Sequence, residues 1–212
     1  MSFPEIVQIG WPVVAAYVIG ATPFGYLAGR LRGLDIREHG SGNIGATNVF
    51  RVLGKPLGIT VLTLDVLKGL IPVLIAKAAN DNSLIHIFSA IGAILGHNYT
   101  FWLKFRGGKG IATSAGALAP ILPIPLVVGM LAWFILHQTL RWVSVASIGA
   151  ALALPITVAI QSLFFNKPWD WPVLGFAAFL AIMAIWRHRS NIGRLMKGEE
   201  PKTPRKSKPA KD

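Results

Sequence analysis

The stretch IATSAGALAPILPIPLVVGMLAWFILHQTL, residues 111–140, is almost entirely apolar and longer than the roughly 20 residues that one membrane-crossing helix needs. Its middle carries three prolines, Pro120, Pro123 and Pro125. Proline breaks a helix because it lacks a backbone donor and clashes with the preceding turn. The stretch therefore predicts two short or half-length helices, Ile111–Ala119 and Pro125–Leu140, joined by a proline turn that returns the chain to the side it left.

The composition of the whole chain is typical of a membrane protein. Hydrophobic residues make up 53% and charged residues 14% of the 212 residues, against about 25% charged in a soluble domain. Backbone polar groups must be paired inside a bilayer, so apolar runs predict helices, and alternating strand segments are absent. Further runs lie at about 8–29, 56–78, 84–103, 142–165 and 171–187. We expect an all-α integral membrane protein with about seven transmembrane helices, some short or broken by proline.

Most of the 21 lysine and arginine residues fall into four groups between these runs. The groups are Arg30, Arg32, Arg37, Arg51 and Lys55; Lys104, Arg106 and Lys109; Arg141; and the basic residues from Arg187 to Lys211. Only a seven-helix count puts all four on one face, which the positive-inside rule makes cytoplasmic. We therefore expect an external N-terminus, a membrane domain over residues 1–198 and a disordered basic cytoplasmic tail over residues 199–212. This topology explains the net charge of +12 without a nucleic-acid partner.

Two glycine-rich polar segments lie directly beside apolar runs. They read GSGNIGATN at residues 40–48 and FRGGKG at residues 105–110. Glycine lets backbone N–H groups approach phosphate oxygens closely, and Arg51, Arg106 and Lys109 supply positive charge. The second segment also precedes the helix expected from Ile111, whose N-terminal dipole favours an anion. The segments therefore predict an anion site at the membrane boundary.

Several other chemistries are excluded by the residues present. The G-x-G-x-x-G pattern of Gly40, Gly42 and Gly45 follows no strand, so a dinucleotide fold is excluded. Lys109 is followed by Gly110 instead of Ser or Thr, which argues against nucleotide hydrolysis. The chain has no cysteine, so it has no thiol nucleophile. No histidine and carboxylate group has ligand spacing, and we expect neither a metal nor a cofactor.

Five motifs spread over nearly the whole chain carry a family resemblance. They are residues 40–48 with Val49 and Arg51; Gly96-His-Asn98; residues 105–113; Ser144-x-Ala-Ser147; and Arg187 and His188 with Asn191, Ile192, Arg194 and Leu195. With these motifs the chain resembles the bacterial acyl-phosphate glycerol-3-phosphate acyltransferases. The resemblance implies seven membrane helices in the bacterial inner membrane and an active site at the cytoplasmic face. It also implies acyl transfer from a fatty acyl phosphate to glycerol 3-phosphate, giving 1-acyl-glycerol 3-phosphate and phosphate.

The resemblance assigns roles to individual residues. The implied acyl phosphate site comprises Gly42, Gly45, Thr47, Asn48, Gly107, Gly108, Lys109 and Gly110. The implied glycerol 3-phosphate site comprises Ser41, Arg51, Lys109, Ser147, His188 and Asn191. The implied catalytic residues are His188, Ser41 and Asn43. The expected partners are the two substrates, the lipid bilayer and the enzyme that forms the acyl phosphate.

The chemistry leaves two choices open. An acyl phosphate has a good leaving group, so the acceptor hydroxyl can attack without a covalent intermediate, while Ser41 remains an alternative as a transient nucleophile. Backbone donors of the glycine segments, with Asn43 or Asn48, are expected to stabilise the developing oxyanion. Either His188 or a substrate phosphate oxygen takes the proton.

A few polar residues outside these sets also have two interpretations. Asp65 and Lys68 lie three residues apart within the run 56–78, where a charged pair is either a functional site or a structural ion pair. His97 is either catalytic or a helix-end histidine that orders residues 104–110.

Two other function classes compete with acyl transfer. Broken helices whose N-termini point at an anion are typical of transporters for phosphorylated metabolites. Such a site lies at the membrane midplane, however, whereas the polar segments here are expected at one face. A non-catalytic scaffold that binds anionic lipid predicts basic residues without ordered Gly, Ser and Asn segments.

Overall fold

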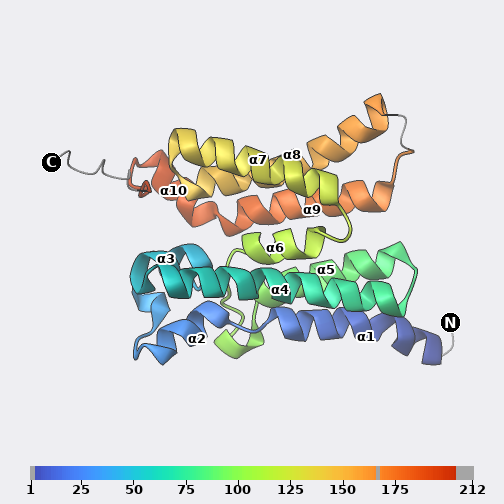
Figure 1. Ribbon diagram of the computed structural model, residues 1–212, viewed down its shortest axis with the longest axis horizontal. Helices are drawn as coiled ribbons and strands as arrows, with labels where there is room; N and C mark the ends of the chain where they lie inside the picture. Colours follow the sequence, from blue (N-terminus) through green and yellow to red (C-terminus); the bar gives the residue numbers. More distant parts are fainter. Residues whose placement is uncertain (1–2, 166–167, 204–212) are drawn as a thin grey trace. The chain divides into compact units, whose positions relative to one another are not determined.

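A computed structural model describes residues 3–165 and 168–203, and every regular element in this part of the chain is a helix. The predicted all-α class is therefore confirmed. The chain divides into two compact units, with the boundary after Leu126. The helices of each unit run side by side (Figure 1).

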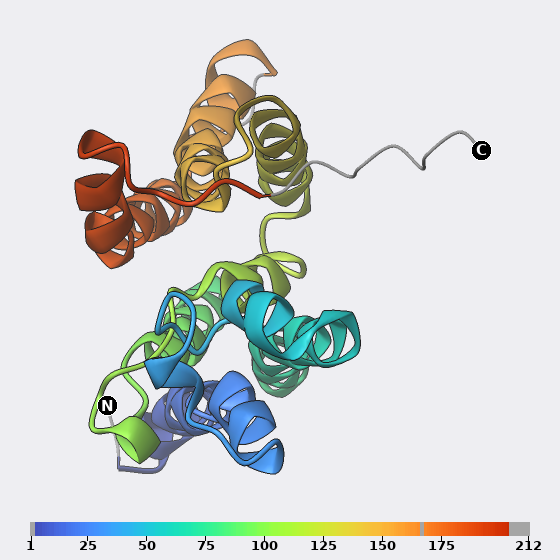
Figure 2. The same cartoon turned by 90° about the vertical axis from the view of Figure 1, so that its left-hand side faces the viewer.

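Within the described residues, the first unit holds three long helices and three short ones. The long helices are α1 (Phe3–Gly20), α4 (Lys55–Ala79) and α5 (Ser83–Asn98), and the short ones are α2 (Phe24–Leu31), α3 (Ala46–Leu53) and α6 (Ile111–Leu118). Two 3-10 turns, η1 (Ile36–Glu38) and η2 (Phe101–Leu103), lie in the connections. Both views show α1, α4 and α5 packed together (Figures 1 and 2), with α3 against α4 and α6 against α4 and α5.

Helices of this unit approach one another at glycines. A side chain at Gly96 of α5 would collide with the Tyr17 carbonyl oxygen of α1, and one at Gly116 of α6 would collide with the Val66 carbonyl oxygen of α4. Lipid tails are as apolar as the helix surfaces, so helix association in a membrane depends on close van der Waals contact. Small residues at these positions allow that contact.

The proline-rich stretch is broken as predicted. α6 ends at Leu118, and a turn leads to α7 (Pro123–Leu140). α7 begins two residues earlier than expected because proline is tolerated in the first turn, where its missing N–H would have no helical partner. The Lys77 ammonium donates to the Pro120 carbonyl oxygen over 2.9 Å and so holds the turn against α4.

Fewer helices are long enough to cross a membrane than the seven that the sequence predicts. Within the described residues, four segments are long and apolar enough to cross a membrane, namely Gly10–Leu31, α4, α7 and α8 (Val143–Phe164). The bent pair α9 (Trp171–Arg187) and α10 (Arg189–Met196) would make a fifth. α5 has 16 residues because it ends at Asn98, inside its apolar run, and α6 has 8 because it ends at Leu118, before Pro120. Seven spans therefore stay a prediction.

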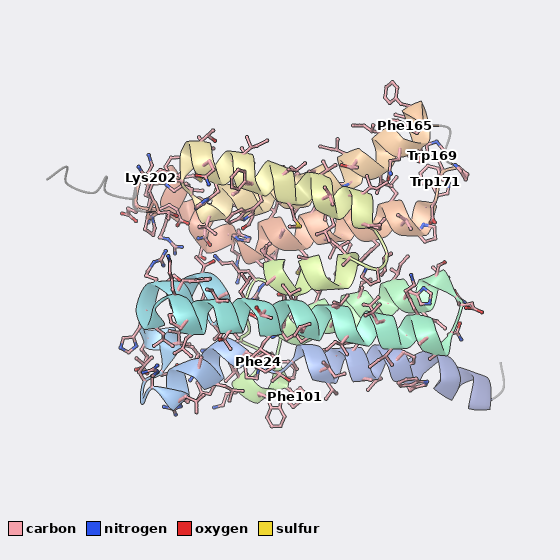
Figure 3. The ribbon with its side chains drawn as sticks, viewed as in Figure 1. Phe24, Phe101, Phe165, Trp169, Trp171 and Lys202 are labelled. Atoms are coloured by element: carbon pink, nitrogen blue, oxygen red, sulfur yellow. The ribbon has the colours of Figure 1, made fainter. Side chains whose placement is uncertain are left out.

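The second unit contains most of α7, from Val127 onward, together with α8, α9 and α10. α8 packs against α9, and α10 bends away from α9 by 55° (Figure 2). The indole N–H of Trp133 on α7 donates to the Ser147 hydroxyl on α8 over 3.2 Å. Trp169 and Trp171, labelled in Figure 3, stack with ring centroids 5.4 Å apart where the chain enters α9.

The chain beyond α10 is held as far as Thr203, although the sequence predicts disorder from residue 199. The Trp142 indole N–H donates to the Glu200 carbonyl oxygen over 3.1 Å, and the Arg141 guanidinium donates to the Thr203 carbonyl oxygen over 3.0 Å. The Lys202 ammonium, labelled in Figure 3, lies 4.5 Å from the centre of the Trp142 ring. Contacts made by residues far away in the sequence order this segment. The rest of the predicted tail, residues 204–212, lies outside the described residues.

Candidate active site

The first glycine segment is organised by a buried amide. Asn48, 1% exposed at the start of α3, accepts a hydrogen bond from the Ser41 backbone N–H over 2.8 Å. Its amide nitrogen donates to the carbonyl oxygens of Ile36 and His39 over 3.2 and 3.0 Å. Gly40 and Gly42 adopt positive φ angles of 62° and 68°, which close the loop around this amide. The Asn48 side chain therefore shapes the loop from within.

Other polar side chains of this segment face outward. Asn43 accepts from the Gly45 backbone N–H over 2.8 Å in a local turn of the Asx type. Ser41, Thr47 and Arg51 are exposed. Within the described part of the chain, the Arg51 guanidinium makes no hydrogen bond or ion pair. It remains available to an anion from outside the protein.

The second glycine segment folds back onto the end of α5. The Gly107 N–H donates to the Asn98 carbonyl oxygen and the Gly108 N–H to the His97 carbonyl oxygen, each over 3.1 Å. The sequence predicts that these two N–H groups bind phosphate, but both serve to attach the loop. Gly110 has a positive φ of 82° and starts α6.

The open backbone N–H donors lie further along the chain, at the start of α6. The first N–H groups of any helix lack an intrahelical acceptor. Within the described residues, no group accepts from the backbone N–H groups of residues 110–113, which begin α6 behind Lys109. Lys109 therefore directly precedes the positive N-terminal end of α6, and this combination favours the binding of an anion.

The two glycine segments share one cleft in the first unit. This cleft has a volume of about 440 Å³, and its lining residues are Asp35, Arg37, Glu38, Gly42, Ile44, Arg106 and Gly107. Arg37 is already neutralised, because its Nη2 lies 2.6 Å from Asp35 Oδ2. The hydrogen bonds from Arg37 lower the pKa of Asp35 to about 2. Glu38 and Arg106 also line the cleft, so its acidic and basic side chains balance in number.

Behind the second glycine segment lies a buried charged cluster. Asp65 and Lys68 of α4 form an ion pair of 2.7 Å and are 1% and 3% exposed. His97 Nδ1 lies 3.7 Å from Asp65 Oδ1. His97 is buried, and its backbone carbonyl oxygen accepts a hydrogen bond from the Gly108 N–H. Of the two interpretations of His97, this geometry favours the one in which it orders the loop.

In the second unit, His188 ends α9 with a defined tautomer. Its Nδ1 lies 2.8 Å from the Ala184 carbonyl oxygen. A carbonyl oxygen can only accept, so Nδ1 carries the proton and Nε2 of the neutral ring holds a lone pair. His188 is therefore oriented as a proton acceptor.

Three side chains of the second unit meet at one carboxylate. Glu200 accepts from the Ser144 hydroxyl over 2.7 Å, from the Asn191 amide over 2.6 Å and from the Arg194 guanidinium over 2.8 Å. Burial acts to raise the pKa of Glu200, but the hydrogen bonds outweigh it and leave that pKa below its ordinary value. Ser147, by contrast, donates to the Val143 carbonyl oxygen over 2.8 Å and binds Trp133. Its hydroxyl connects α7 and α8.

Comparisons with known proteins match almost all of these motifs. The family model described as glycerol-3-phosphate acyltransferase matches residues 11–198. The chain belongs to the glycerol-3-phosphate acyltransferase family. Curated members from Desulforamulus reducens and Synechococcus elongatus are 44% and 45% identical to it, over 89% and 88% of this chain and 92% and 90% of theirs.

Solved structures agree with this assignment. PlsY, an integral membrane glycerol 3-phosphate acyltransferase, has been crystallised in a glycerol 3-phosphate form. That structure is 38% identical to this acyltransferase, with a TM-score of 0.84 over 92% of this chain and 96% of the other. A lysophosphatidic acid form of PlsY matches with a TM-score of 0.82. The protein is therefore a multi-pass membrane acyltransferase of phospholipid synthesis, which excludes the transporter and the scaffold.

The acyltransferase distributes its predicted site residues over both units. Its first unit holds Ser41, Gly42, Asn43, Gly45, Thr47, Asn48, Arg51, Gly107, Gly108, Lys109 and Gly110; its second unit holds Ser147, His188 and Asn191. Their roles stay predictions. The described residues contain no group of three or more His, Cys, Asp or Glu side chains placed to hold a metal ion.

Sequence reasoning missed two participants in the second unit. Ser144, not Ser147, shares a partner with Asn191, and Glu200 is that partner. Ser144 was visible in its motif, but its spacing does not distinguish it from Ser147. Glu200 lay within the segment expected to be disordered, so no local signal identified it.

Glu200→Gln is expected to lower the thermal stability of the acyltransferase at pH 7. The amide keeps the shape of the carboxylate but loses charge-assisted hydrogen bonds, each worth about 1.5–3 kcal/mol. Because the pKa of Glu200 is lowered on folding, its stabilisation is present above the ordinary value of 4.5 and is lost as the pH falls further. Unfolding in detergent between pH 7 and about pH 3 should show a gap in melting temperature between variant and wild type that is constant above about pH 5 and narrows below 4.5. A gap that does not change with pH would contradict this role.

Proposed function

We propose that the protein transfers a fatty acyl group from acyl phosphate to the 1-hydroxyl of glycerol 3-phosphate. The products are 1-acyl-sn-glycerol 3-phosphate, which is lysophosphatidic acid, and inorganic phosphate. The observation that carries the proposal is the open helix end of residues 110–113 directly behind Lys109, beside the cleft that the two glycine segments share. This is an anion site next to apolar helices, as a phosphorylated lipid precursor requires.

The donor phosphate is assigned to Lys109 and the first backbone N–H groups of α6. Gly107 and Gly108 then act by keeping the loop against α5, and Gly110 supports the sharp entry into the helix. Gly42, Gly45 and Thr47 contribute from the other glycine segment. Asn48 contributes by holding that segment in shape.

The reaction needs no covalent enzyme intermediate. The acceptor hydroxyl oxygen forms a bond to the acyl carbon, and the bond from that carbon to the phosphate oxygen breaks, so phosphate leaves with the electron pair. Backbone donors and the Asn43 amide stabilise the oxyanion that develops on the acyl oxygen. The hydroxyl proton passes to Nε2 of His188, whose ring orientation supports this role.

The acceptor is assigned to Ser41, Arg51, Lys109, Ser147, His188 and Asn191. Arg51 is the first choice for the acceptor phosphate, because its guanidinium is exposed and offers a planar pair of donors. Ser144 joins this set since it shares Glu200 with Asn191, and Ser147 then contributes mainly by packing.

Arg51→Ala is expected to raise KM for glycerol 3-phosphate by about 10- to 100-fold, because a charge-assisted hydrogen bond is lost. Arg51→Lys should recover only part of this loss, since lysine keeps the charge without the planar fork. Steady-state kinetics at saturating acyl phosphate measure both. Arg32→Ala, which removes another exposed arginine before the segment, is the control and should behave as wild type. If Arg51→Lys restores the wild-type KM, Arg51 contributes only its positive charge, and the planar pair of donors plays no part.

The proposed location is the bacterial inner membrane, with the N-terminus outside and the C-terminus in the cytoplasm. The four groups of basic residues support it. Tags placed after Asp212 and within residues 33–37 are expected to be cytoplasmic, and tags at residues 80–83 and 166–170 external. Accessibility to a membrane-impermeant reagent in intact spheroplasts tests each position. An external C-terminus would contradict the seven-span topology.

One assay tests the proposed activity. Purified protein in detergent receives acyl phosphate and labelled glycerol 3-phosphate, with acyl-CoA and acylated acyl carrier protein as alternative donors. Labelled lysophosphatidic acid is expected from acyl phosphate alone. Product from either thioester donor, with none from acyl phosphate, would overturn the donor assignment.

A further inference from the structure

The buried Asp65–Lys68 pair has no place in the reaction proposed above. Both side chains lie on α4 and are nearly inaccessible, at 1% and 3% exposure. A buried ion pair seldom adds net stability over apolar residues of similar size, because both charges lose their hydration. Charged residues inside a membrane segment are accordingly functional candidates by default.

Lys68 connects α4 to the chain between α1 and α2, ahead of the first glycine segment. Its ammonium donates to the Thr22 carbonyl oxygen over 2.7 Å, at the break between α1 and α2. It also lies 5.4 Å from the centre of the Phe24 ring, a residue labelled in Figure 3. The same carbonyl oxygen also accepts from the Phe24 backbone N–H over 3.1 Å, so the ammonium joins a hydrogen bond that already shapes this break.

Asp65 connects α4 to the second glycine segment through His97. Nδ1 of His97 lies 3.7 Å from Asp65 Oδ1. The opposite edge of the ring faces Gly108, where an added methyl group would collide with His97 Nε2. The His97 backbone carbonyl oxygen accepts from the Gly108 N–H over 3.1 Å. The imidazole therefore lies between a fixed carboxylate and the backbone that leads into Lys109.

We propose that Asp65 is a positioning residue for the lysine-bearing loop and acts through His97. The carboxylate orients the imidazole, and the imidazole together with its backbone carbonyl sets the position of Gly108 and hence of Lys109. Lys68 holds the Asp65 carboxylate in place through the 2.7 Å ion pair. The proposal rests on the proposed function for its kinetic readout, since that function assigns acyl phosphate to this loop.

The test must separate positioning from mere structural support. Asp65→Asn alone leaves the Lys68 charge buried without its partner and can fail to fold. The double variant Asp65→Asn/Lys68→Met removes both charges together, which is often neutral for stability. If the pair is only structural, this double variant should regain wild-type behaviour.

Positioning predicts a different result. The double variant should unfold close to the wild-type temperature but show KM for acyl phosphate raised about tenfold, with KM for glycerol 3-phosphate changed less than about twofold. His97→Asn should raise the donor KM similarly, and adding it to the double variant should cause little further change, because both act through one contact. A double variant with wild-type donor KM would overturn the proposal. So would fully additive effects.

A second readout needs no substrate. The chain contains no cysteine, so Lys104→Cys provides a single reporter at an exposed position of the loop. In the double variant this thiol should react with a maleimide several-fold faster than in the wild-type background, and Thr47→Cys in the first glycine segment serves as the comparison position. Unchanged labelling at position 104 would refute the inference. If the wild-type protein fails to use acyl phosphate, only the proposed function is lost, and the labelling result still decides the role of Asp65.

Discussion

His188→Gln and His188→Asn are both expected to lower kcat by roughly 100-fold or more, the usual contribution of a general base. Neither amide can take up a proton at neutral pH. The ring orientation supports the prediction, because the hydrogen bond from Nδ1 to the Ala184 carbonyl oxygen leaves Nε2 as the acceptor. Initial rates at saturating concentrations of both substrates measure the loss.

The two His188 variants also separate catalysis from binding. Asparagine places its amide near the position of Nδ1 and can keep the contact with Ala184, whereas glutamine reaches the position of Nε2. If His188 only holds the acceptor through Nε2, glutamine should be nearly normal and asparagine defective. Near-normal turnover of the glutamine variant would thus assign the proton to a substrate phosphate and leave His188 a binding role.

Lys109→Ala is expected to lower kcat/KM for acyl phosphate by about 10- to 150-fold, which corresponds to the roughly 1.5–3 kcal/mol of one charge-assisted hydrogen bond. The loss should appear mainly in the donor KM, because the helix end behind Lys109 remains to stabilise the reacting group. Lys104→Ala is the matched control, since it removes an exposed lysine of the same loop that lies outside the proposed site. It should stay within about twofold of wild type.

An equal loss of kcat/KM in Lys109→Ala and Lys104→Ala would mean that the overall positive charge of the loop matters and not a specific bond from Lys109. A large effect of Lys109→Ala on the acceptor KM alone would move Lys109 to the glycerol 3-phosphate site. Gly108→Ala is informative beside them. Its methyl group would collide with His97, so it should displace the loop while leaving the Lys109 charge intact.

The sequence alone determined the helical class, the break in the stretch 111–140 and the positions of the motifs. Each follows from a local physical rule. Apolar runs in lipid must pair their own backbone groups, and prolines remove donors where they stand. These rules need no knowledge of the partner helices, so α6 and α7 separate close to where the prolines predict.

The tertiary structure decided which polar atoms are already engaged. Gly107 and Gly108 look like phosphate donors in the sequence, but their N–H groups serve carbonyl oxygens of α5. Asn48 resembles a ligand, yet its amide is taken up by its own loop.

The same reason governs the charged residues. Asp65 meets His97, and Glu200 meets Ser144, although these partners are far apart in the chain. Composition and spacing describe what a residue can bind, whereas the fold decides which partner comes near enough for a hydrogen bond or an ionic contact. The motifs therefore identified the family, and packing between distant segments decided whether each motif residue faces outward or holds its neighbours in place.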